Sequence, residues 1–573
     1  MYGRDTTRTG NALAVSGILL LVASSCTANL LIRHGLPVAH DMVFHLFQAD
    51  QFNLSIAGGS IRPRWAISAN NGYGSPNFIF YAPAGYYLAS LFHSLIPSTI
   101  ISVILAIWSS FFFSGLTMFL AARKLFGREG SLLSAMLYQL LPFHLVNLYT
   151  RGAYSELCAY VWYPLIIMFL YETLSSRRSA IAPACLSLSY AGLILTHLVS
   201  GFMMTLAALF LVLYNGVFGR CRKGSLPAAV SLVIGLGIAA FYLLPVIFER
   251  KFVQIDYLFN YIFSDYRHNF LFSPGTYAAT RSTFLYNALH LTVIFEAMLF
   301  LALVVLVSRR DRGPEQRPEI GALSCIFIGA LFLTTPLSAP LWAHFSSFAT
   351  LQFPWRWVSV MELSLCLLVG AAYSERNLFR LFPAGIMARA ATYCIITLSV
   401  VSHILIARSS DVHPEKFLES ILDPELAVRY RNLPKEYTPV WATDLEKLLT
   451  EENAGKVSLL SGRAEHRVME WQPEKRIVGV KAATPVLMRI RTFYYPGWEA
   501  DIDGRKTGID VEAKTGAMLI TVPQGGHTVT VHFGETPLRV ISGYLSLASC
   551  LLLVFYALMV RKSILSGCPE QAE

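Results

Sequence analysis

Acidic and histidine side chains gather directly after the first long apolar run, in the stretch AHDMVFHLFQAD at 39–50. Asp41 and His45 stand four residues apart, so on a helix they would share a face and could pair. A carboxylate at the boundary between membrane and water can act as a general base on a hydroxyl, and it could also hold a divalent cation. The plainer interpretation makes Asp41 and Asp50 solvated caps of an interfacial helix.

A second group of charges lies in YTRGAYSELCAYVWYP at 149–164, which contains Arg151 and Glu156. One interpretation is a simple ion pair across a short loop. The other is a second acid that faces the first loop, with Arg151 beside a phosphate. Spacing alone favours neither.

A third cationic group is Arg356 in LQFPWRWVSV at 351–360, where Trp355 and Trp357 flank it. A guanidinium makes bidentate contacts with phosphate, and the two indoles could line an isoprenoid chain. Tryptophans also anchor helices at the membrane interface, and arginine can snorkel there, so plain anchoring is the alternative.

Histidine and aromatic side chains supply further candidates. His144 and His197 lie near the ends of apolar runs, where a lone histidine is more often packed and hydrogen-bonded than functional. His197 is nevertheless a candidate wall of the same site, as is Tyr81 in the aromatic segment 77–96. Tyr495 and Trp498 in FYYPGWEADIDG could stack on sugars, but core packing is the favoured interpretation.

The composition indicates what must position these residues. The 573 residues are 54% hydrophobic and only 14% charged, whereas soluble domains carry about 25% charged residues. A polytopic membrane protein follows, and the net charge of +10 does not indicate nucleic-acid binding. The nine cysteines are scattered without a CxxC, so they predict neither a disulfide framework nor a zinc site.

Twelve apolar runs are predicted to span the membrane, and the first is expected to be an uncleaved helix and not a signal peptide. With the N-terminus in the cytoplasm, basic residues fall at every second junction, as the positive-inside rule requires. The C-terminus is then also cytoplasmic. The runs are 12–32, 98–121, 131–149, 157–174, 180–198, 201–218, 226–247, 286–307, 320–337, 357–373, 386–407 and 538–560.

This topology places the large first loop, 33–97, and the polar segment 408–537 on the same extracytoplasmic side. Within that loop, 77–96 is apolar enough to span, but a thirteenth span would move a basic junction outside, so an interfacial helix is predicted. Alternating runs such as KRIVGVKA and HTVTVHF, separated by Gly and Pro turns, predict an antiparallel β-sandwich. The expected organisation is therefore a membrane domain over 1–407, a mainly β domain over 408–537 and a final helix and tail over 538–573.

The stretches HDMVFHLFQ, NFIFYAPAGYYLAS, RGAYSELCA, LTHLVSG, LQFPWRW and KEYTPVWA together resemble bacterial membrane proteins described as 6-pyruvoyl-tetrahydropterin-synthase-related. FYYPGWEADIDG and the last span resemble the end of YfhO-like proteins. Both groups resemble GT-C glycosyltransferases, and the resemblance covers nearly the whole chain. It implies a GT-C-like bundle, a polyprenyl-phosphate-linked sugar donor and a catalytic acid at Asp41. His40 precedes Asp41 where that superfamily commonly has a second acid, so the need for a metal stays open.

The function expected from the resemblance is an integral-membrane glycosyltransferase at the outer face of a bacterial cytoplasmic membrane. Asp41, His45 and Glu156 are its catalytic candidates. The acceptor would be a glycan, a lipid or a protein. The alternatives are a membrane factor without enzymatic activity, which assembles or transports envelope lipids or polysaccharide, and a receptor that binds glycans through 408–537. The substrate-binding candidates are Arg151, Arg356, Trp355, Trp357, Tyr81 and His197.

Overall fold

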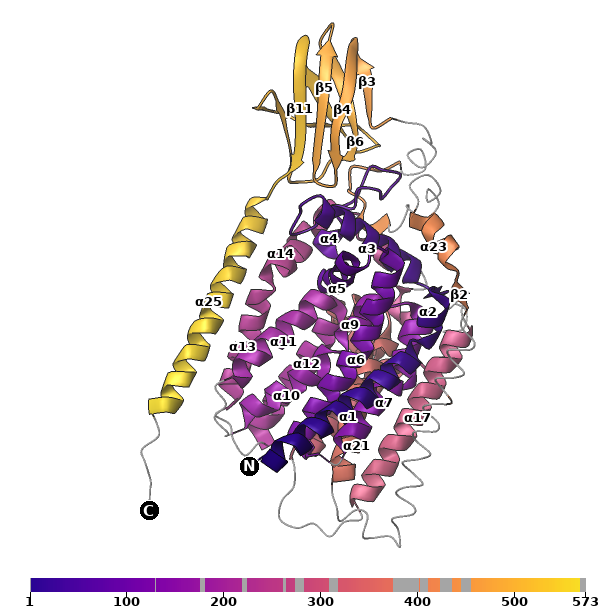
Figure 1. Ribbon diagram of the computed structural model, residues 1–573, viewed down its shortest axis with the longest axis vertical. Coiled ribbons are helices and arrows are strands. Elements are labelled where there is room, and N and C mark those ends of the chain that lie inside the picture. Colours follow the sequence, from indigo (N-terminus) through magenta and orange to yellow (C-terminus); the bar gives the residue numbers. More distant parts are fainter. Residues whose placement is uncertain are drawn as a thin grey trace.

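The computed structural model has a bundle of helices with a β-sandwich at one end (Figure 1). This confirms the predicted fold class of a mainly helical membrane protein with an antiparallel sandwich before its last helix. The structure describes residues 2–128, 130–175, 181–218, 224–260, 264–273, 283–308, 318–374, 401, 411–422, 435–444 and 455–566.

Long apolar helices form the bundle, and local signals set their ends. The Ser98 side chain accepts a hydrogen bond from the amide of Ile101 at the start of α6, and Gly127 follows its last residue at a φ of +98°. The helices are α1 (Tyr2–Cys26), α2 (Ala28–Arg33), α6 (Thr99–Phe126), α7 (Ser131–Leu140), α8 (Pro142–Val146), α9 (Tyr154–Ala159), α10 (Trp162–Leu174), α11 (Ala182–Thr196), α12 (Leu198–Phe218), α13 (Ser225–Ile238), α14 (Ala240–Glu249), α17 (Thr283–Ser308), α18 (Pro318–Thr334), α21 (Val358–Ser374) and α25 (Pro537–Ser566).

Among the described residues, seven helical segments are long and apolar enough to cross a membrane, or nine if two bent pairs each count as one span. Two shorter apolar helices, Ala12–Cys26 and Ala182–Thr196, lie where further spans are predicted. The predicted span 386–407 falls outside the described residues apart from Val401. In an 18-residue window of Pro354–Tyr373, 94% of the residues are buried, against 17% in such a window of Pro537–Leu558, so the span that begins near Arg356 is central and α25 is peripheral.

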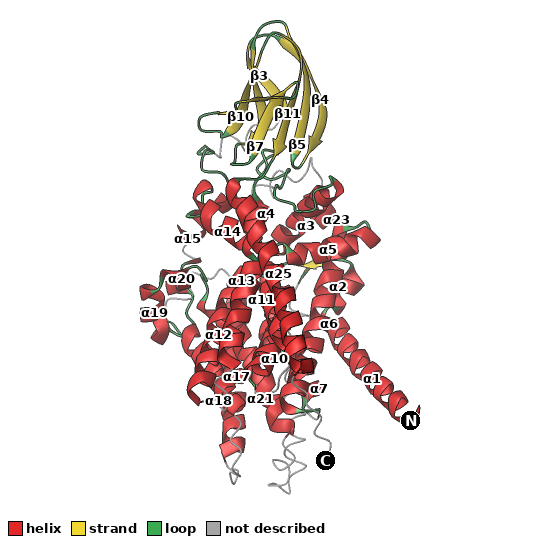
Figure 2. Ribbon diagram, turned by 90° about the vertical axis from the view of Figure 1, so that its left-hand side faces the viewer, coloured by secondary structure: helices red, strands yellow, loops and turns green. Residues whose placement is uncertain are grey.

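The first large loop folds into short helices between the bundle and the sandwich (Figure 2). Its aromatic segment breaks at Pro83 into α4 (Asn77–Phe80) and α5 (Ala84–Leu95), which follow α3 (Met42–Ala57). The 12 residues of α5 reach about 18 Å, short of the roughly 30 Å of a bilayer core. The segment 77–96 is therefore not a span, in line with the prediction. Other short helices are α15 (Tyr257–Asn260), α19 (Ala339–His344), α20 (Ser346–Ala349) and α23 (Glu415–Leu422).

Two antiparallel sheets form the sandwich, in the strand orders β3-β6-β10-β9 and β4-β5-β11-β7-β8. Alternate residues point inward, so that Val478 and Val480 of one sheet and Met488 and Ile490 of the other share one buried core. Tyr495 and Trp498 belong to this core, as predicted. The strands are β3 (Val457–Ser461), β4 (Ala464–Gln472), β5 (Lys475–Ala482), β6 (Val486–Phe493), β7 (Trp498–Ile502), β8 (Arg505–Thr507), β9 (Asp510–Val511), β10 (Ala517–Val522) and β11 (Gly525–Phe533).

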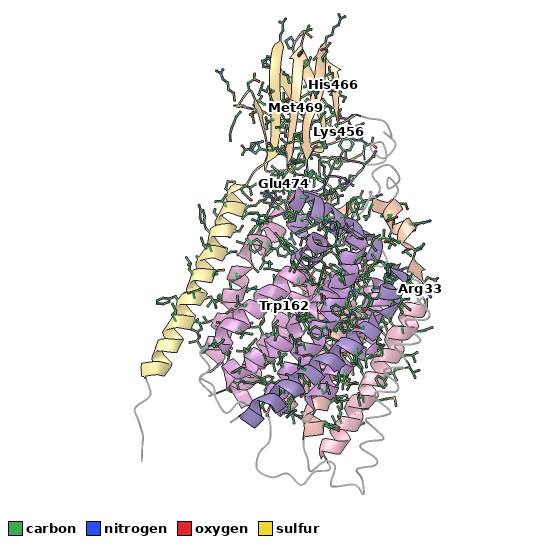
Figure 3. The ribbon with its side chains drawn as sticks, in the orientation of Figure 1. Arg33, Trp162, Lys456, His466, Met469 and Glu474 are labelled. Carbon is green, nitrogen blue, oxygen red and sulfur yellow. The ribbon has the colours of Figure 1, made fainter. Side chains whose placement is uncertain are left out.

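Side chains from distant parts of the chain attach the sandwich to the bundle. Glu249, the last residue of α14, forms an ion pair of 2.7 Å with Arg539 of α25, and both side chains are almost fully buried. Arg64 of the first loop forms an ion pair of 2.8 Å with Glu474. Figure 3 shows Glu474 at the base of the sandwich. The two-stranded ladder of β1 (Leu36–Pro37) and β2 (Val412–His413) joins the first loop to the segment that precedes α23, outside the sandwich.

Candidate functional site

Asp41 precedes α3 as its N-cap residue. Its backbone contacts the end of the short helix η1 (Asn147–Arg151). The amide of Asp41 donates to the carbonyl of Arg151 at 2.9 Å. Gly152 makes this approach possible, because its φ is +65° and a Cβ there would lie 2.7 Å from the amide nitrogen of Met42. The glycine in TRGAY therefore lets the two loops touch.

The carboxylate of Asp41 is unusual for an N-cap aspartate because it does not cap its helix. It is exposed, and it has no hydrogen-bond partner or ion pair among the described side chains. One side is open to solvent while protein surrounds the other sides, and this desolvation raises the pKa of Asp41. The positive charges of Arg151, His40 and Arg356 act in the opposite direction. Asp41 is thus a free carboxylate in a field of cationic groups.

Arg151 and Glu156 form the buried ion pair that was one of the two predicted interpretations, at 2.7 Å. Asn147 accepts a hydrogen bond from Arg151 and donates one to Glu156 at 3.4 Å. The guanidinium also lies 4.6 Å from the ring centre of Trp355. Glu156 is consequently engaged and only 1% exposed, so it does not present a free second carboxylate beside Asp41.

The same hydrogen-bonded group continues into the centre of the bundle. Asn147 donates to the Tyr160 hydroxyl at 3.4 Å, and Tyr160 donates to Glu362 at 3.1 Å. Glu362 also accepts from the amide of Phe143 at 3.0 Å. Glu296 of α17 interacts electrostatically with Glu362, and both of its carboxyl oxygens are buried without a hydrogen-bond partner. Glu296 and Glu362 were not among the predicted site residues, although each lies inside a predicted span, where an ionisable residue is a functional signal.

Arg356 lies in the short helix η7 (Pro354–Trp357), which leads into α21. Its guanidinium donates to the carbonyl of Leu351 at 2.7 Å and stacks on Phe353 at 4.9 Å. It forms no ion pair with a described carboxylate, and its Nε is buried without a partner. The guanidinium therefore keeps donors for an anion.

The tryptophans beside Arg356 do not form the predicted lining for an isoprenoid chain. Trp355 is 5% exposed and Trp357 is 3% exposed, and both belong to the core of the bundle. Trp355 instead stacks with Arg151, which positions that guanidinium. Large aromatic surfaces are stabilised by burial, so the helix turns both indoles toward its neighbours.

The predicted pairing of His45 with Asp41 is wrong. The Nδ1 atom of His45 lies 2.9 Å from the Tyr86 hydroxyl, and the ring is packed against Tyr81 and Tyr154. Burial lowers the pKa of His45 to about 3, so the imidazole is neutral. Asp41 precedes the first helical residue, so the spacing of four does not place the two side chains on one helix face. Tyr81 itself is half-buried, and the charge of Asp41 acts on its hydroxyl.

His197 and His144 differ in their surroundings. His197 is half-buried, and its Nδ1 atom lies 2.7 Å from the Ser200 hydroxyl, which also accepts from Tyr163. His144 is fully buried between the rings of Phe111 and Tyr160 and is a packed residue. Of these two histidines, only His197 keeps access to solvent.

Glu436 lies near Asp41, although it was not among the predicted site residues. It lies in the short helix Lys435–Tyr437, within the quoted stretch KEYTPVWA, and is half-buried. Burial raises the pKa of Glu436, and the negative charge of Asp41 raises it further. Tyr437 stacks on Phe80 at 5.8 Å, which fixes this segment against α4. Among the described residues no group of three His, Cys, Asp or Glu side chains is arranged to hold a metal ion.

Comparison with solved structures finds proteins of similar arrangement at low identity. The Archaeoglobus fulgidus oligosaccharyltransferase AglB, in complex with an inhibitory peptide and a dolichol-phosphate, is 13% identical over 75% of this chain and 60% of its own, with a TM-score of 0.43. Arabinofuranosyltransferase AftD from Mycobacteria is 16% identical over 69% of this chain and 26% of its own, with a TM-score of 0.45. ArnT from Cupriavidus metallidurans, bound to undecaprenyl phosphate, is 14% identical over 65% of this chain and 78% of its own, with a TM-score of 0.31.

The chain spans less than two thirds of the oligosaccharyltransferase and about a quarter of the arabinofuranosyltransferase. Comparison with curated proteins gave no match. A family model for membrane proteins with a 6-pyruvoyl-tetrahydropterin synthase related domain matches residues 78–411, which is more than half of the chain. This match confirms the family that the sequence stretches indicated: the chain belongs to the 6-pyruvoyl-tetrahydropterin synthase related membrane proteins.

Proposed function

We propose that this protein is an integral-membrane glycosyltransferase that transfers a sugar from a polyprenyl-phosphate-linked donor to a glycan, lipid or protein acceptor. The observation that carries the proposal is the free, solvent-accessible carboxylate of Asp41 in the field of Arg356. A base without a protein partner and a cation without a carboxylate partner are the two groups that this transfer requires.

The reaction assigns a separate role to each group. Asp41 accepts the proton of the acceptor hydroxyl while the oxygen forms a bond to the anomeric carbon. The bond between that carbon and the phosphate oxygen breaks, and the polyprenyl phosphate leaves with its electron pair. Attack from the face opposite the phosphate inverts the anomeric centre. Arg356 stabilises the negative charge that grows on the phosphate.

The phosphate is best explained as part of a lipid because Arg356 stands at the start of α21, a candidate membrane span. A phosphate at this level would leave an apolar chain in the bilayer, and the base that meets it would face water. Desolvation of Asp41 supports its role, because a raised pKa brings a carboxylate closer to the range where a general base works well.

The remaining residues support these two groups. Arg151 holds the backbone of Asp41 through its carbonyl, and Glu156 balances the Arg151 charge, so both are positioning residues in this proposal. Glu436 and Tyr81 border the acceptor side. The sandwich would cap the site or hold the acceptor, on the extracytoplasmic side of a bacterial cytoplasmic membrane.

The test compares Asp41→Asn with Asp50→Asn in purified protein supplied with polyprenyl-phosphate sugars and candidate acceptors. Both substitutions neutralise an acid associated with α3, but Asp50 lies nine residues further along, where Gln51 donates to its carboxylate. Loss of a general base is expected to slow transfer by about 10²–10⁴-fold, with the Asp50 variant unchanged. An arm with EDTA tests whether a divalent cation takes part.

Two outcomes would count against the proposal. Transfer that survives Asp41→Asn at the wild-type rate removes the general-base role. Absence of transfer by the wild type with every donor and acceptor favours the alternative, a non-enzymatic factor for assembly or transport of envelope lipids or polysaccharide.

A further inference from the structure

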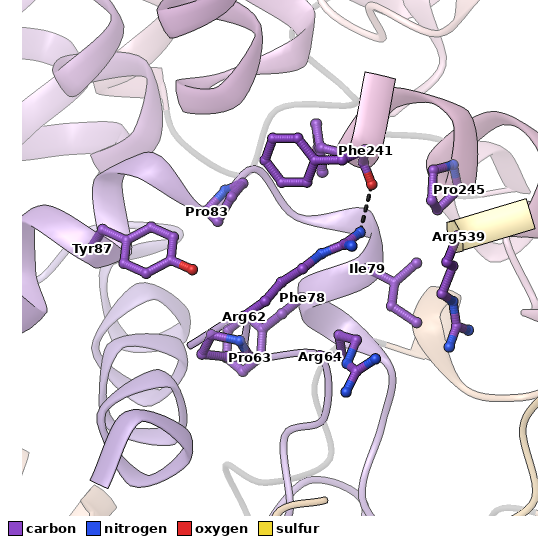
Figure 4. A pocket seen from close by; sticks show the side chains of 11 residues that line it. Arg62, Pro63, Arg64, Phe78, Ile79, Pro83, Tyr87, Phe241, Pro245 and Arg539 are labelled. Atoms are coloured by element: carbon purple, nitrogen blue, oxygen red, sulfur yellow. Dashed lines mark hydrogen bonds between the residues drawn. The ribbon is translucent and has the colours of Figure 1, made fainter. Parts of the chain in front are cut away.

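A pocket lies where the first loop meets α4, α5, α14 and α25 (Figure 4). Phe78 and Tyr87 of this pocket pack on Phe52 of α3, which lies 11 residues after Asp41, or about 16 Å along the helix axis. The pocket is lined by Arg62, Pro63, Arg64, Phe78, Ile79, Pro83, Tyr87, Phe241, Tyr242, Pro245 and Arg539.

Arg62 extends into this pocket and donates to the carbonyl of Phe241 at 2.5 Å, as the dashed line in Figure 4 shows. That carbonyl is available because Pro245, four residues later in α14, has no N–H to donate to it. The guanidinium also lies 5.0 Å from the ring centre of Phe241. One of its five donors is therefore used on an uncharged acceptor.

The other two arginines of the pocket already have carboxylate partners. Arg64 pairs with Glu474 at 2.8 Å and with Glu535 at 2.5 Å, while Arg539 pairs with Glu249. Arg62 has no ion pair with a described carboxylate, although Glu535 acts on it from a longer distance. The Arg62 side chain is half-buried, so water does not fully hydrate the N–H donors that Phe241 leaves free. A half-buried guanidinium without a counter-ion is costly unless an anion completes it.

The helices around the pocket expose apolar side chains. Leu91 of α5 is 59% exposed, Phe248 of α14 is 56% exposed and Ile541 of α25 is 62% exposed. Pro537–Leu558 is a candidate membrane span, and Arg539 lies two residues inside its start. A guanidinium without a described carboxylate partner, on elements that also carry exposed apolar side chains near the end of a candidate span, matches a lipid, whose head is anionic and whose chains are apolar.

We propose that the phosphate headgroup of an anionic membrane lipid binds at the mouth of this pocket, because the cavity itself, about 20 Å³, has room for little more than a water molecule. Arg62 is the main contact, and the lipid chains lie on α5, α14 and α25. The site is separate from the one at Asp41 and Arg356 and does not depend on glycosyl transfer. An occupant there would bridge the first loop, α14 and α25, which are also the elements that carry the sandwich.

The experiment titrates the purified full-length protein with phosphatidylglycerol and counts bound lipids by native mass spectrometry. The variants are Arg62→Gln, Arg62→Lys and the matched control Arg33→Gln, an exposed arginine at the end of α2 (Figure 3). Arg62→Gln is expected to lower the affinity for one bound lipid by about tenfold or more, because a charge-assisted hydrogen bond is lost. Arg62→Lys keeps the charge and should weaken it less, and Arg33→Gln should leave it unchanged.

Two comparison ligands test the class of ligand. Diacylglycerol, which has the same chains without phosphate, should not occupy the site, and millimolar inorganic phosphate should not displace the lipid. Equal binding to wild type and Arg62→Gln overturns the proposal, as does an equal loss in Arg33→Gln. Displacement by inorganic phosphate would overturn the assignment to a lipid. Thermal unfolding of each variant verifies that it folds. If Arg62→Gln does not fold, the lipid affinity of Arg62→Lys is compared with that of the wild type instead.

Discussion

Neutralising Glu249 should loosen the sandwich from the bundle. Its carboxylate accepts hydrogen bonds from Arg539 at 2.9 and 2.7 Å, from Tyr495 at 2.9 Å and from Thr536 at 3.2 Å. In Glu249→Gln the amide NH₂ group faces a donor of Arg539, and the buried guanidinium loses its counter-charge. Breaking one partner of a buried ion pair costs about 3–5 kcal/mol.

Hydrogen exchange measures this cost locally. The amides of Trp498 and Gly534 donate to Tyr495 and Gly497, so both report on the contact with Arg539. If local opening limits exchange, a loss of about 3–5 kcal/mol makes these amides exchange about 10²–10³-fold faster or more. Peptides that contain them can be followed by mass spectrometry in detergent or nanodiscs.

Glu499→Gln is the control, because Glu499 pairs with Lys506 at a similar distance of 2.7 Å but on the exposed surface. Surface pairs contribute little, so exchange should stay near the wild-type rate. Replacing both Glu249 and Arg539 by leucine should recover much of the loss, since no unpaired charge is left. Unchanged exchange in Glu249→Gln, or an equal acceleration in Glu499→Gln, would refute the reasoning.

Three further predictions concern the site and the bundle. Gly152→Ala should lower kcat/KM for transfer by about 10²-fold, because its Cβ would displace the backbone beside Asp41, whereas Gly59→Ala, at a φ of +87° with open space around it, should not. Glu436→Gln removes a negative charge near Asp41, so the pKa of Asp41 should fall and the acidic limb of the pH–rate profile should move to lower pH. An acidic limb that stays in place or moves to higher pH contradicts the electrostatic interaction between the two carboxyl groups. Glu296→Met should raise the unfolding temperature, because an apolar side chain of similar size replaces two carboxyl oxygens that are buried without partners. Glu362→Gln should lower it, because Glu362 accepts hydrogen bonds from Tyr160 and Phe143.

Much of the fold could be predicted because its signals are local in the chain. Runs of about twenty apolar residues indicate spans, and period-two alternation with Gly and Pro turns indicates strands. The spans around α6 and α21 and the core positions of Tyr495 and Trp498 follow from such patterns. Asp41 could be selected for the same reason, since an acid beside an apolar run is visible without knowledge of its neighbours.

The partners of these residues were decided by the tertiary structure. Asp41 comes within electrostatic range of Arg151, Arg356 and Glu436 only because four distant segments pack together, and no spacing in the chain encodes that proximity. His45 turned to Tyr86 because a buried imidazole takes the hydroxyl that packing brings to it, and Trp355 turned inward to Arg151. Hydropathy depends on each residue and its neighbours in sequence, whereas side-chain pairing depends on which helix faces meet. The sequence by itself therefore determined the elements and the acid, and packing determined what the acid can do.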